Sequence, residues 1–312
     1  MTMRFDDDVV IITGAGRGLG REYALAFAKR GAAVVVNDPG TEDGRSVAQA
    51  VVDEIAALGG RAMMDANSVA ERAGAAALVE TALAAFGKVT VLVNNAGIIS
   101  FAPIAAISES DWHAMQSVTL DGAFHMCAVV WPLMKSQGHG RIINTTSNAG
   151  FAGSETLGAY GAAKLGVAGL TKCLAQEAVG TGITVNAVAP MAVTRMNREA
   201  FFGGTEPDGE DWQTDIREGR VPMGPPSIVA PTVLWLAHRE TQINGEIFSS
   251  SSGKVARVAF VVGEGYFDPS HGPEELAEHA DSIRALGSYL EPASTADELA
   301  LIPPLFMSGL EL

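Results

Sequence analysis

The chain has 312 residues, 47% hydrophobic and 18% charged, a balance that predicts one large folded core and excludes an intrinsically disordered protein. The formal net charge of −15 would repel a phosphate backbone, so we expect no nucleic-acid partner. The two cysteines, Cys127 and Cys173, stand apart with no histidine at ligand spacing, a pattern that predicts buried thiols, no disulfide framework and no metal site.

Short runs rich in β-branched residues alternate along the chain with longer Ala- and Leu-rich segments of helical period. This alternation predicts an α/β fold, a single Rossmann-type, doubly wound parallel sheet with helices on both faces. The runs are apolar throughout because a strand covered on both faces buries both of its rows of side chains. The predicted strands are 9–13, 33–37, 61–65, 89–93, 141–145 and 183–188, and the predicted helices are 19–29, 43–58, 70–86, 108–134 and 159–178.

Two regions depart from this alternation. The Gly-, Pro- and acid-rich composition of 197–226 predicts a substrate loop or lid at about 195–226. We expect a dinucleotide-binding catalytic domain over 1–250 and a C-terminal extension over 251–312 that packs on the same domain or on a partner subunit. Within this extension, the sequence GPEEL predicts a helix that begins at Pro273.

The first predicted strand runs directly into the glycine-rich sequence TGAGRGLG. Glycines let the backbone turn sharply and approach a ligand, and free N–H groups at a helix start attract an anion such as a pyrophosphate. The spacing differs from GxGxxG, and a plain tight turn would look similar, but the strand before it and the helix after it favour a dinucleotide site. The candidate cofactor-binding residues here are Gly14, Gly16, Arg17, Gly18, Leu19 and Gly20.

Asp38 follows the second predicted strand. A carboxylate at this place accepts hydrogen bonds from both ribose hydroxyls of adenosine and repels a 2′-phosphate, so it predicts NAD as the cofactor and makes NADP the less favoured one. Arg17 points the other way, because a cation in the turn could pair with a 2′-phosphate. An aspartate before Pro39 could also be a simple turn residue.

Tyr160 and Lys164 lie four residues apart in AYGAAKLGVAG, a spacing that puts both on one helix face. A phenol with an unperturbed pKa of about 10 is too weak a base to take an alcohol proton at neutral pH. We expect the Lys164 ammonium to stabilise the phenolate and lower that pKa. Taken alone, the pair could equally lie at the rim of an Ala-rich packing helix.

Together, TGAGRGLG, NNAG at 94–97, Ser147 and Tyr160-x-x-x-Lys164 resemble the short-chain dehydrogenase/reductase family over roughly the first 250 residues. The resemblance implies an NAD(P)-dependent oxidoreductase that acts on CH–OH groups and forms a dimer or tetramer, with Ser147, Tyr160 and Lys164 as catalytic residues. It also implies these further cofactor contacts: Tyr160, Lys164, Asn67, Ser68, Asn95, Ala96, Gly97, Pro190, Val193 and Thr194.

Two positions depart from the family pattern. Thr119 stands where the family has a fourth catalytic residue, an asparagine that holds a relay water largely through its backbone carbonyl. Because threonine has the same carbonyl, we expect a weakened or rerouted proton relay and retained activity. Met191 follows Pro190 where the family has glycine, and its bulk puts the local backbone path in question.

Longer stretches, among them RFDDDVVIITGAGRGLGREYALAFAKRGAAVVVNDPG and APMAVTRM, resemble the dehydrogenase part of the peroxisomal multifunctional enzyme of β-oxidation and its free-standing bacterial relatives. Those relatives act on (3R)-hydroxyacyl-CoA esters or hydroxysteroids, in lipid or steroid metabolism, and both substrates need a large apolar pocket. Candidate pocket residues are Phe101, Phe151, Leu157, Met191, Phe201, Phe202 and Trp212, and candidate phosphate-binding cations are Arg195, Arg198, Arg217 and Arg220.

A competing interpretation is a non-catalytic NAD-binding sensor or scaffold protein with a degenerate site, for which Thr119 and Met191 would be early signs. Retention of Ser147, Tyr160 and Lys164 argues against it. The three aspartates at 6–8 and the lack of an uninterrupted apolar run of about 20 residues predict a cytoplasmic protein with a small-molecule substrate and no membrane partner.

Overall fold

The computed structural model describes residues 2–194, 212–218 and 223–299. The chain divides into two compact units, and the second begins at Val258. The first unit holds a sheet with the strand order β10-β9-β8-β7-β6-β1-β2-β5. The sequence predicted six of these strands, and the first three of them have the predicted bounds. The strands are β1 (Val9–Thr13), β2 (Ala33–Asn37), β5 (Arg61–Asp65), β6 (Val91–Asn94), β7 (Gly140–Thr145), β8 (Ile183–Met191), β9 (Ile247–Ser251) and β10 (Lys254–Val258).

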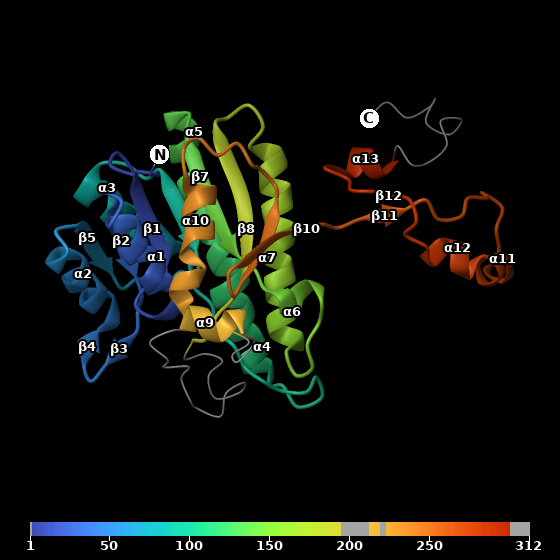
Figure 1. Cartoon of the computed structure of the whole chain (residues 1–312), viewed down its shortest axis with the longest axis horizontal. Coiled ribbons are helices and arrows are strands. Elements are labelled where there is room, and N and C mark those ends of the chain that lie inside the picture. Colours follow the sequence, from blue (N-terminus) through green and yellow to red (C-terminus); the bar gives the residue numbers. More distant parts are fainter. Residues whose placement is uncertain (1, 195–211, 219–222, 300–312) are drawn as a thin grey trace. The chain divides into compact units, whose positions relative to one another are not determined.

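Helices cover both faces of this sheet (Figure 1). Alternate residues of β1 enter opposite cores: Val10 and Ile12 pack in one, and Ile11 in the other. This explains the apolar runs, and it confirms the predicted doubly wound fold. One core is completed by α1 (Gly18–Ala28), α2 (Val47–Ala57) and α10 (Ala230–Ala237), and the other by α3 (Arg72–Phe86), α5 (Gly122–Gln137) and α7 (Gly158–Glu177).

The predicted helix 43–58 begins later than expected, because residues 41–46 form a small hairpin. In this hairpin β3 (Thr41–Glu42) pairs antiparallel with β4 (Arg45–Ser46). Asp43 and Gly44 both have positive φ, 48° and 75°, as the Asp-Gly turn of a two-residue hairpin requires. The Ser46 hydroxyl then accepts a hydrogen bond from the Gln49 N–H at 3.2 Å and caps α2.

The long predicted helix near 108–134 is one continuous helical segment with a wider turn inside it. It comprises α4 (Glu109–Met115), a π-helical stretch (Gln116–Asp121) and α5. By length and composition Glu109–Gln137 could cross a membrane, with a mean hydropathy of 1.2 in its most apolar window, which the sequence analysis did not anticipate. Core helices meet the same criteria, and α5 packs against β6, β7 and α3.

Cys127 is buried, as expected, but Cys173 is exposed. The prediction was wrong for Cys173 because its neighbours on α7, Leu174 and Ala175, are the ones that pack in the core. In the described residues no group of three or more His, Cys, Asp or Glu side chains lies close enough together to hold a metal ion.

The elements that the structure describes in the second unit, up to residue 299, are all short. The helix predicted at Pro273 is confirmed as α11 (Pro273–Glu278), where the Glu275 carboxylate accepts a hydrogen bond from the Gly272 N–H at 2.9 Å. No residue described between 258 and 298 is buried, so this unit has little core of its own. Its other elements are α12 (Ala280–Arg284), α13 (Thr295–Leu299) and the antiparallel pair β11 (Val262–Gly263) and β12 (Tyr289–Leu290).

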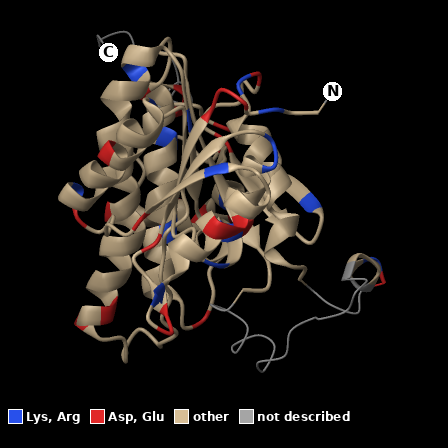
Figure 2. Cartoon of the chain, turned by 90° about the vertical axis from the view of Figure 1, so that its left-hand side faces the viewer, with Lys and Arg blue, Asp and Glu red and all other residues tan. Residues whose placement is uncertain are grey.

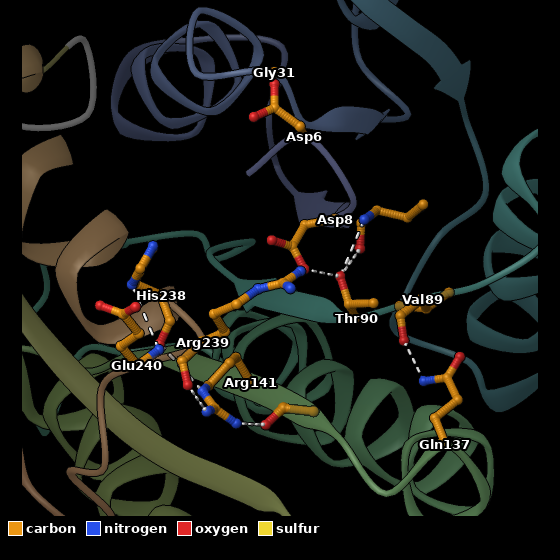
Figure 3. A network of polar contacts seen from close by, with 12 residues as sticks. Asp6, Asp8, Gly31, Val89, Thr90, Gln137, Arg141, His238, Arg239 and Glu240 are labelled. Atoms are coloured by element: carbon orange, nitrogen blue, oxygen red, sulfur yellow. Dashed lines mark hydrogen bonds and ion pairs between the residues drawn. The ribbon is translucent and has the colours of Figure 1, made fainter. Parts of the chain in front are cut away.

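A buried arginine connects the amino ends of the strands with the loop after α10 (Figure 3). Arg141 is 3% exposed, and its guanidinium donates to the carbonyls of Arg239 at 2.7 Å, Gly140 at 2.9 Å and Gly182 at 3.1 Å. Burial lowers the pKa of this group. Because buried carbonyls need donors, Arg141 fixes the segment that leads from α10 into β9.

Replacing Arg141 with Met should lower the free energy of unfolding by about 2–4 kcal/mol, because several buried carbonyls lose their donor at once. Arg61→Met is the matched control. Arg61 also donates to two carbonyls, those of Asp6 and Gly31, but it is exposed, so water can replace it and the change should stay within about 1 kcal/mol. Urea unfolding of both variants measures the difference, and equal losses would contradict this assignment.

Candidate active site

The candidate site lies at the carboxyl edge of the parallel strands. The sheet order reverses at β1, which pairs with β2 on one side and with β6 on the other, both in parallel. In such sheets ligands bind in the crevice outside the carboxyl ends at this switch point. The turns that carry the predicted residues follow β1, β2, β6 and β7, so the fold brings them to one edge.

The glycine turn between β1 and α1 has the features of an anion site. Gly14 and Gly18 have φ of 62° and 54°, a region that side chains other than glycine disfavour. The N-cap residue of α1, Arg17, makes no side-chain cap, and the first turn holds no acidic residue. The N–H groups there therefore suit a pyrophosphate. Beyond β8, a Thr194 methyl lies 3.7 Å from where a Gly18 Cβ would be, so Thr194 borders the turn.

Asn95 holds this turn in place. Its side-chain amide donates to the carbonyls of Thr13 at 2.9 Å and Gly14 at 3.0 Å, while the Thr13 hydroxyl accepts from the N–H groups of Asn95 and Ala96, both at 3.0 Å. The structure thus gives Asn95 a positioning role, and its predicted contact with adenosine stays a prediction. Sequence reasoning missed Thr13, whose only signal was a hydroxyl at the end of the strand before the turn.

Asp38 is fixed where β2 ends. One carboxylate oxygen accepts from the Gly16 N–H at 3.1 Å and the other from the Gly40 N–H at 2.8 Å. The bond to Gly40 is the turn interaction that the alternative interpretation expected. The bond to Gly16 ties the same carboxylate to the glycine turn, and its role toward the adenosine ribose stays a prediction.

A second acidic residue, Asp65, organises the loop after β5. Its carboxylate accepts from the Asn37 amide at 2.8 Å, the Asn67 N–H at 2.9 Å and the Thr81 hydroxyl at 2.9 Å. Asn67 is therefore held in position, whereas Ser68 is exposed and its hydroxyl accepts a hydrogen bond from the Ala70 N–H at 3.3 Å. Sequence reasoning missed Asp65, although its place at a strand end signalled it.

Ser147, Tyr160 and Lys164 come together on α7 and the turn after β7. Ser147 caps the short helix α6 (Asn148–Phe151), where its hydroxyl accepts from the Ala149 N–H at 3.2 Å, and it lies near enough to Tyr160 to lower the pKa of that phenol. The Lys164 ammonium lies 5.8 Å from the centre of the Tyr160 ring and donates to the Thr145 carbonyl at 2.7 Å. The predicted trio is therefore adjacent in space.

The pKa of Tyr160 differs from the expectation. Burial raises it, and the hydrogen bond from Ser147 opposes that rise, so the predicted lowering by Lys164 is wrong for this arrangement. The physical reason is orientation, because the ammonium bonds the Thr145 carbonyl and lies beside the ring. Burial also lowers the pKa of Lys164, to about 8. The phenol is therefore protonated at neutral pH.

Thr119 lies in the π-helical stretch and is 2% exposed, and its hydroxyl has no hydrogen-bond partner among the described residues. A Cβ on Gly97 would lie 3.4 Å from that hydroxyl and 3.4 Å from the Lys164 nitrogen. The missing side chain thus leaves a small polar space between the two groups. An unsatisfied buried hydroxyl facing such a space fits a water or a ribose hydroxyl.

The structure describes part of the segment that follows β8 and the predicted lid. Met191 does not end the strand early, because β8 pairs with β9 as far as Met191 and Ser251. Val193 is buried, and its N–H donates to the Gly224 carbonyl at 2.9 Å. Of the predicted lid the structure describes α9 (Trp212–Arg217) and residues from 223 onward. Arg195, Arg198, Arg220, Phe201 and Phe202 lie outside the described residues.

Lys164→Met should stabilise the protein at pH 7. With a folded pKa of about 8 against 10.5 in the unfolded chain, burying the charge costs up to about 3 kcal/mol, less the bond to Thr145. Between pH 8 and 10.5 the unfolded chain binds a proton that the folded chain does not, so wild-type stability rises with pH in this window. The advantage of the variant should therefore shrink between pH 7 and 9.5 in urea unfolding, and a constant difference would contradict it.

Known proteins are similar to this chain in sequence and in fold. The family described as short chain dehydrogenase matches residues 8–202. The chain is 41% identical over 268 residues to the peroxisomal multifunctional enzyme type 2 of Drosophila melanogaster, a match that covers 84% of this chain and 42% of that protein.

Free-standing relatives match over nearly their whole length. A short-chain type dehydrogenase/reductase of Mycobacterium tuberculosis is 39% identical, over 87% of this chain and 92% of that protein. The crystal structure of a short chain dehydrogenase from Mycobacterium avium superposes with a TM-score of 0.76 at 39% identity, covering 90% of this chain and 97% of that one. With the fold and the Ser147, Tyr160 and Lys164 arrangement, these matches show that the chain belongs to the short-chain dehydrogenase/reductase family, oxidoreductases that act on CH–OH groups and use NAD(P).

Proposed function

We propose that this chain is an NAD-dependent oxidoreductase that interconverts a bulky apolar secondary alcohol and its ketone, with a (3R)-hydroxyacyl-CoA as the first substrate class and a hydroxysteroid as the second. The observation that carries the proposal is the group formed by the buried Ser147 and Lys164 and the half-buried Tyr160, which lies at the same edge of the sheet as the glycine turn. A protein that only bound the dinucleotide would not need the serine and the phenol.

The residues divide the chemistry between them. When bound, a nicotinamide cofactor would take up or supply the hydride. In reduction the Tyr160 phenol gives its proton to the ketone oxygen, and in oxidation the Tyr160 phenolate takes the alcohol proton, while the Ser147 hydroxyl hydrogen-bonds the same oxygen. Lys164, whose ammonium is anchored on the Thr145 carbonyl, places positive charge next to the phenol and would reach the ribose. In oxidation, alcohol and NAD become ketone, NADH and one proton.

An apolar surface lies next to this group. In the loop after β6, Ile98, Phe101 and Ile104 are exposed by 39%, 41% and 77%. A Cβ on Gly158 would lie 3.7 Å from the end of the Ile104 side chain, and Gly158 begins α7 two residues before Tyr160. Exposed apolar side chains beside a catalytic phenol support an apolar substrate.

The choice between the two substrate classes rests on charge. A CoA ester carries phosphates that need cations, and on the face drawn in Figure 2 the lysines and arginines are scattered among acidic residues. The name of one relative supports the acyl-CoA class, since a protein of Thauera aromatica that is 35% identical to this chain is a (2S)-[(R)-hydroxy(phenyl)methyl]succinyl-CoA dehydrogenase subunit. A steroid would need no such cations, which keeps it as the second class.

NAD is proposed over NADP because Asp38 presents a fixed carboxylate at the end of β2. We also propose that the chain assembles as a dimer or tetramer, since the second unit buries none of its described residues up to 298 and so gains stability from a surface to pack on. A cytoplasmic location, a small-molecule substrate and the absence of nucleic-acid and membrane partners stay predictions.

The test is a substrate screen followed by NADH fluorescence. The full chain is incubated with NAD or NADP and with (3R)- and (3S)-hydroxyacyl-CoA esters of several lengths and a set of hydroxysteroids. Turnover of the (3R) esters with NAD supports the first class, and turnover of steroids alone supports the second. Binding of NADH without turnover of any substrate would favour the sensor interpretation, and a preference for NADP would contradict the cofactor assignment.

A further inference from the structure

Arg17, the one cation within the glycine turn, is held by the hairpin that follows β2. One terminal nitrogen of its guanidinium, Nη2, donates to the Thr41 carbonyl at 3.2 Å and lies 3.6 Å from a Glu42 carboxylate oxygen. The arginine side chain is 30% exposed and that of Glu42 is 60% exposed. The hairpin was not predicted from the sequence, and it supplies both contacts from β3.

The same guanidinium lies close to Asp38. A Cβ on Gly40 would lie 2.9 Å from an Asp38 carboxylate oxygen and 3.6 Å from the other terminal nitrogen of Arg17, Nη1. Both charges therefore border Gly40, next to the place where the adenosine ribose of a dinucleotide would lie. A cation at this place would attract a 2′-phosphate unless another group competes for it.

We propose that Glu42 is a specificity-determining residue, which holds Arg17 on the hairpin and away from a 2′-phosphate so that the Asp38 carboxylate decides for NAD. The inference rests on the proposed NAD-dependent function and explains why an arginine in the turn need not recruit NADP. A guanidinium recognises phosphate best with two parallel donors. The Thr41 carbonyl and the Glu42 carboxylate both contact Nη2 of Arg17. One of the nitrogens that would bind a phosphate is therefore already engaged before a cofactor binds.

The expected change in NADPH affinity is small, because the side chains of Arg17 and Glu42 are both partly exposed to solvent. Pairs between exposed charges are weak, so releasing Arg17 should strengthen NADPH binding by about threefold to fivefold. NADH has no 2′-phosphate to meet the released cation, so its affinity should change by less than about twofold. Because salt screens exposed charges, the gain for NADPH should fall as ionic strength rises.

The experiment measures dissociation constants of NADH and NADPH by fluorescence titration for the full chain and for Glu42→Gln. Asp43→Asn is the matched control, because it removes one negative charge from the neighbouring residue of the same hairpin, and Asn tolerates the positive φ of 48° found there. We expect tighter NADPH binding in Glu42→Gln only. Adding Arg17→Gln to Glu42→Gln should abolish the gain.

Two outcomes would overturn the assignment of Glu42. Equal gains in Glu42→Gln and Asp43→Asn would mean that only the overall charge matters, and a gain that persists without Arg17 would mean that Glu42 acts on the cofactor directly. Unchanged NADPH affinity in Glu42→Gln would also contradict it. Failure of the proposed function looks different, since the unsubstituted chain would then prefer NADPH or bind neither dinucleotide.

Discussion

Tyr160→Phe should reduce turnover by roughly 10²–10⁴-fold, the range that a positioned proton donor or acceptor contributes, while NADH still binds. The phenol is the group that exchanges a proton with the substrate oxygen, and it is partly buried near Ser147. Removing one hydroxyl leaves the ring, the helix and the Lys164 contact with the Thr145 carbonyl in place. Loss of turnover without loss of binding is therefore the expected pattern.

The pH profile sharpens this prediction. Because burial raises the pKa of Tyr160, the phenol is protonated at neutral pH, and alcohol oxidation in the unsubstituted chain should accelerate as pH rises and phenolate forms. Ketone reduction needs the protonated form, which persists up to the raised pKa, so its rate should stay nearly level over the range in which oxidation accelerates. The residual rate of Tyr160→Phe should lack this dependence. Stopped-flow measurement from pH 6 to 10 tests both directions, because oxidation is followed by the formation of NADH and reduction by its consumption.

Tyr23→Phe provides the matched control. Tyr23 is buried in the core that α1 completes, and its hydroxyl has no hydrogen-bond partner among the described residues, so the same substitution removes an unsatisfied group that has no role in the proposed chemistry. Its activity should equal that of the unsubstituted chain, and its stability should be equal or slightly higher. Comparable losses of activity in the two variants would sink the catalytic assignment of Tyr160.

Gly20→Ala should weaken NADH binding by roughly tenfold or more, corresponding to about 1.4 kcal/mol or above, and should lower the melting temperature. A Cβ at Gly20 would overlap the Gly14 carbonyl oxygen and lie 2.6 Å from the Asn95 amide nitrogen and 2.8 Å from the Ala15 Cα. The turn would have to move, and Asn95 would lose its bonds to the Thr13 and Gly14 carbonyls. Overpacking of this kind costs about 1–3 kcal/mol.

Gly169→Ala is the control for this substitution. Gly169 lies inside α7. Apart from the nearby backbone of the helix itself, no heavy atom would lie within 4 Å of a Cβ at this position. Alanine there should stabilise the helix by up to about 1 kcal/mol and leave NADH affinity unchanged. Differential scanning calorimetry and fluorescence titration give both quantities. Unchanged NADH affinity in Gly20→Ala would mean that the glycine turn does not shape the cofactor site.

The α/β alternation, the bounds of β1, β2 and β5 and the pairing of Tyr160 with Lys164 could be predicted from the residues alone, whereas Ser147 was found through the family resemblance. The residues sufficed because strand and helix periods are local properties, and because a Tyr and a Lys four residues apart share a helix face wherever the helix lies. The helix at Pro273 followed from capping chemistry in the same way.

Other features depended on contacts between distant segments. The strands β9 and β10 lie in a serine-rich stretch with weak strand signals and form because β8 offers an edge with which β9 pairs. The π-helical turn at Thr119, the roles of Thr13 and Asp65, and the contact between Arg17 and Glu42 likewise need residues far apart in sequence to meet.

The pKa of Tyr160 shows most clearly the difference between what local sequence predicts and what tertiary contacts set. The sequence supplied the two groups and their spacing, from which a lowered pKa was expected. Tertiary structure decided the outcome, because the burial of the phenol and the direction in which the Lys164 ammonium points are set by β7, α6 and α7 together. Spacing fixes which groups are neighbours, whereas solvation and orientation fix how strongly they act on each other.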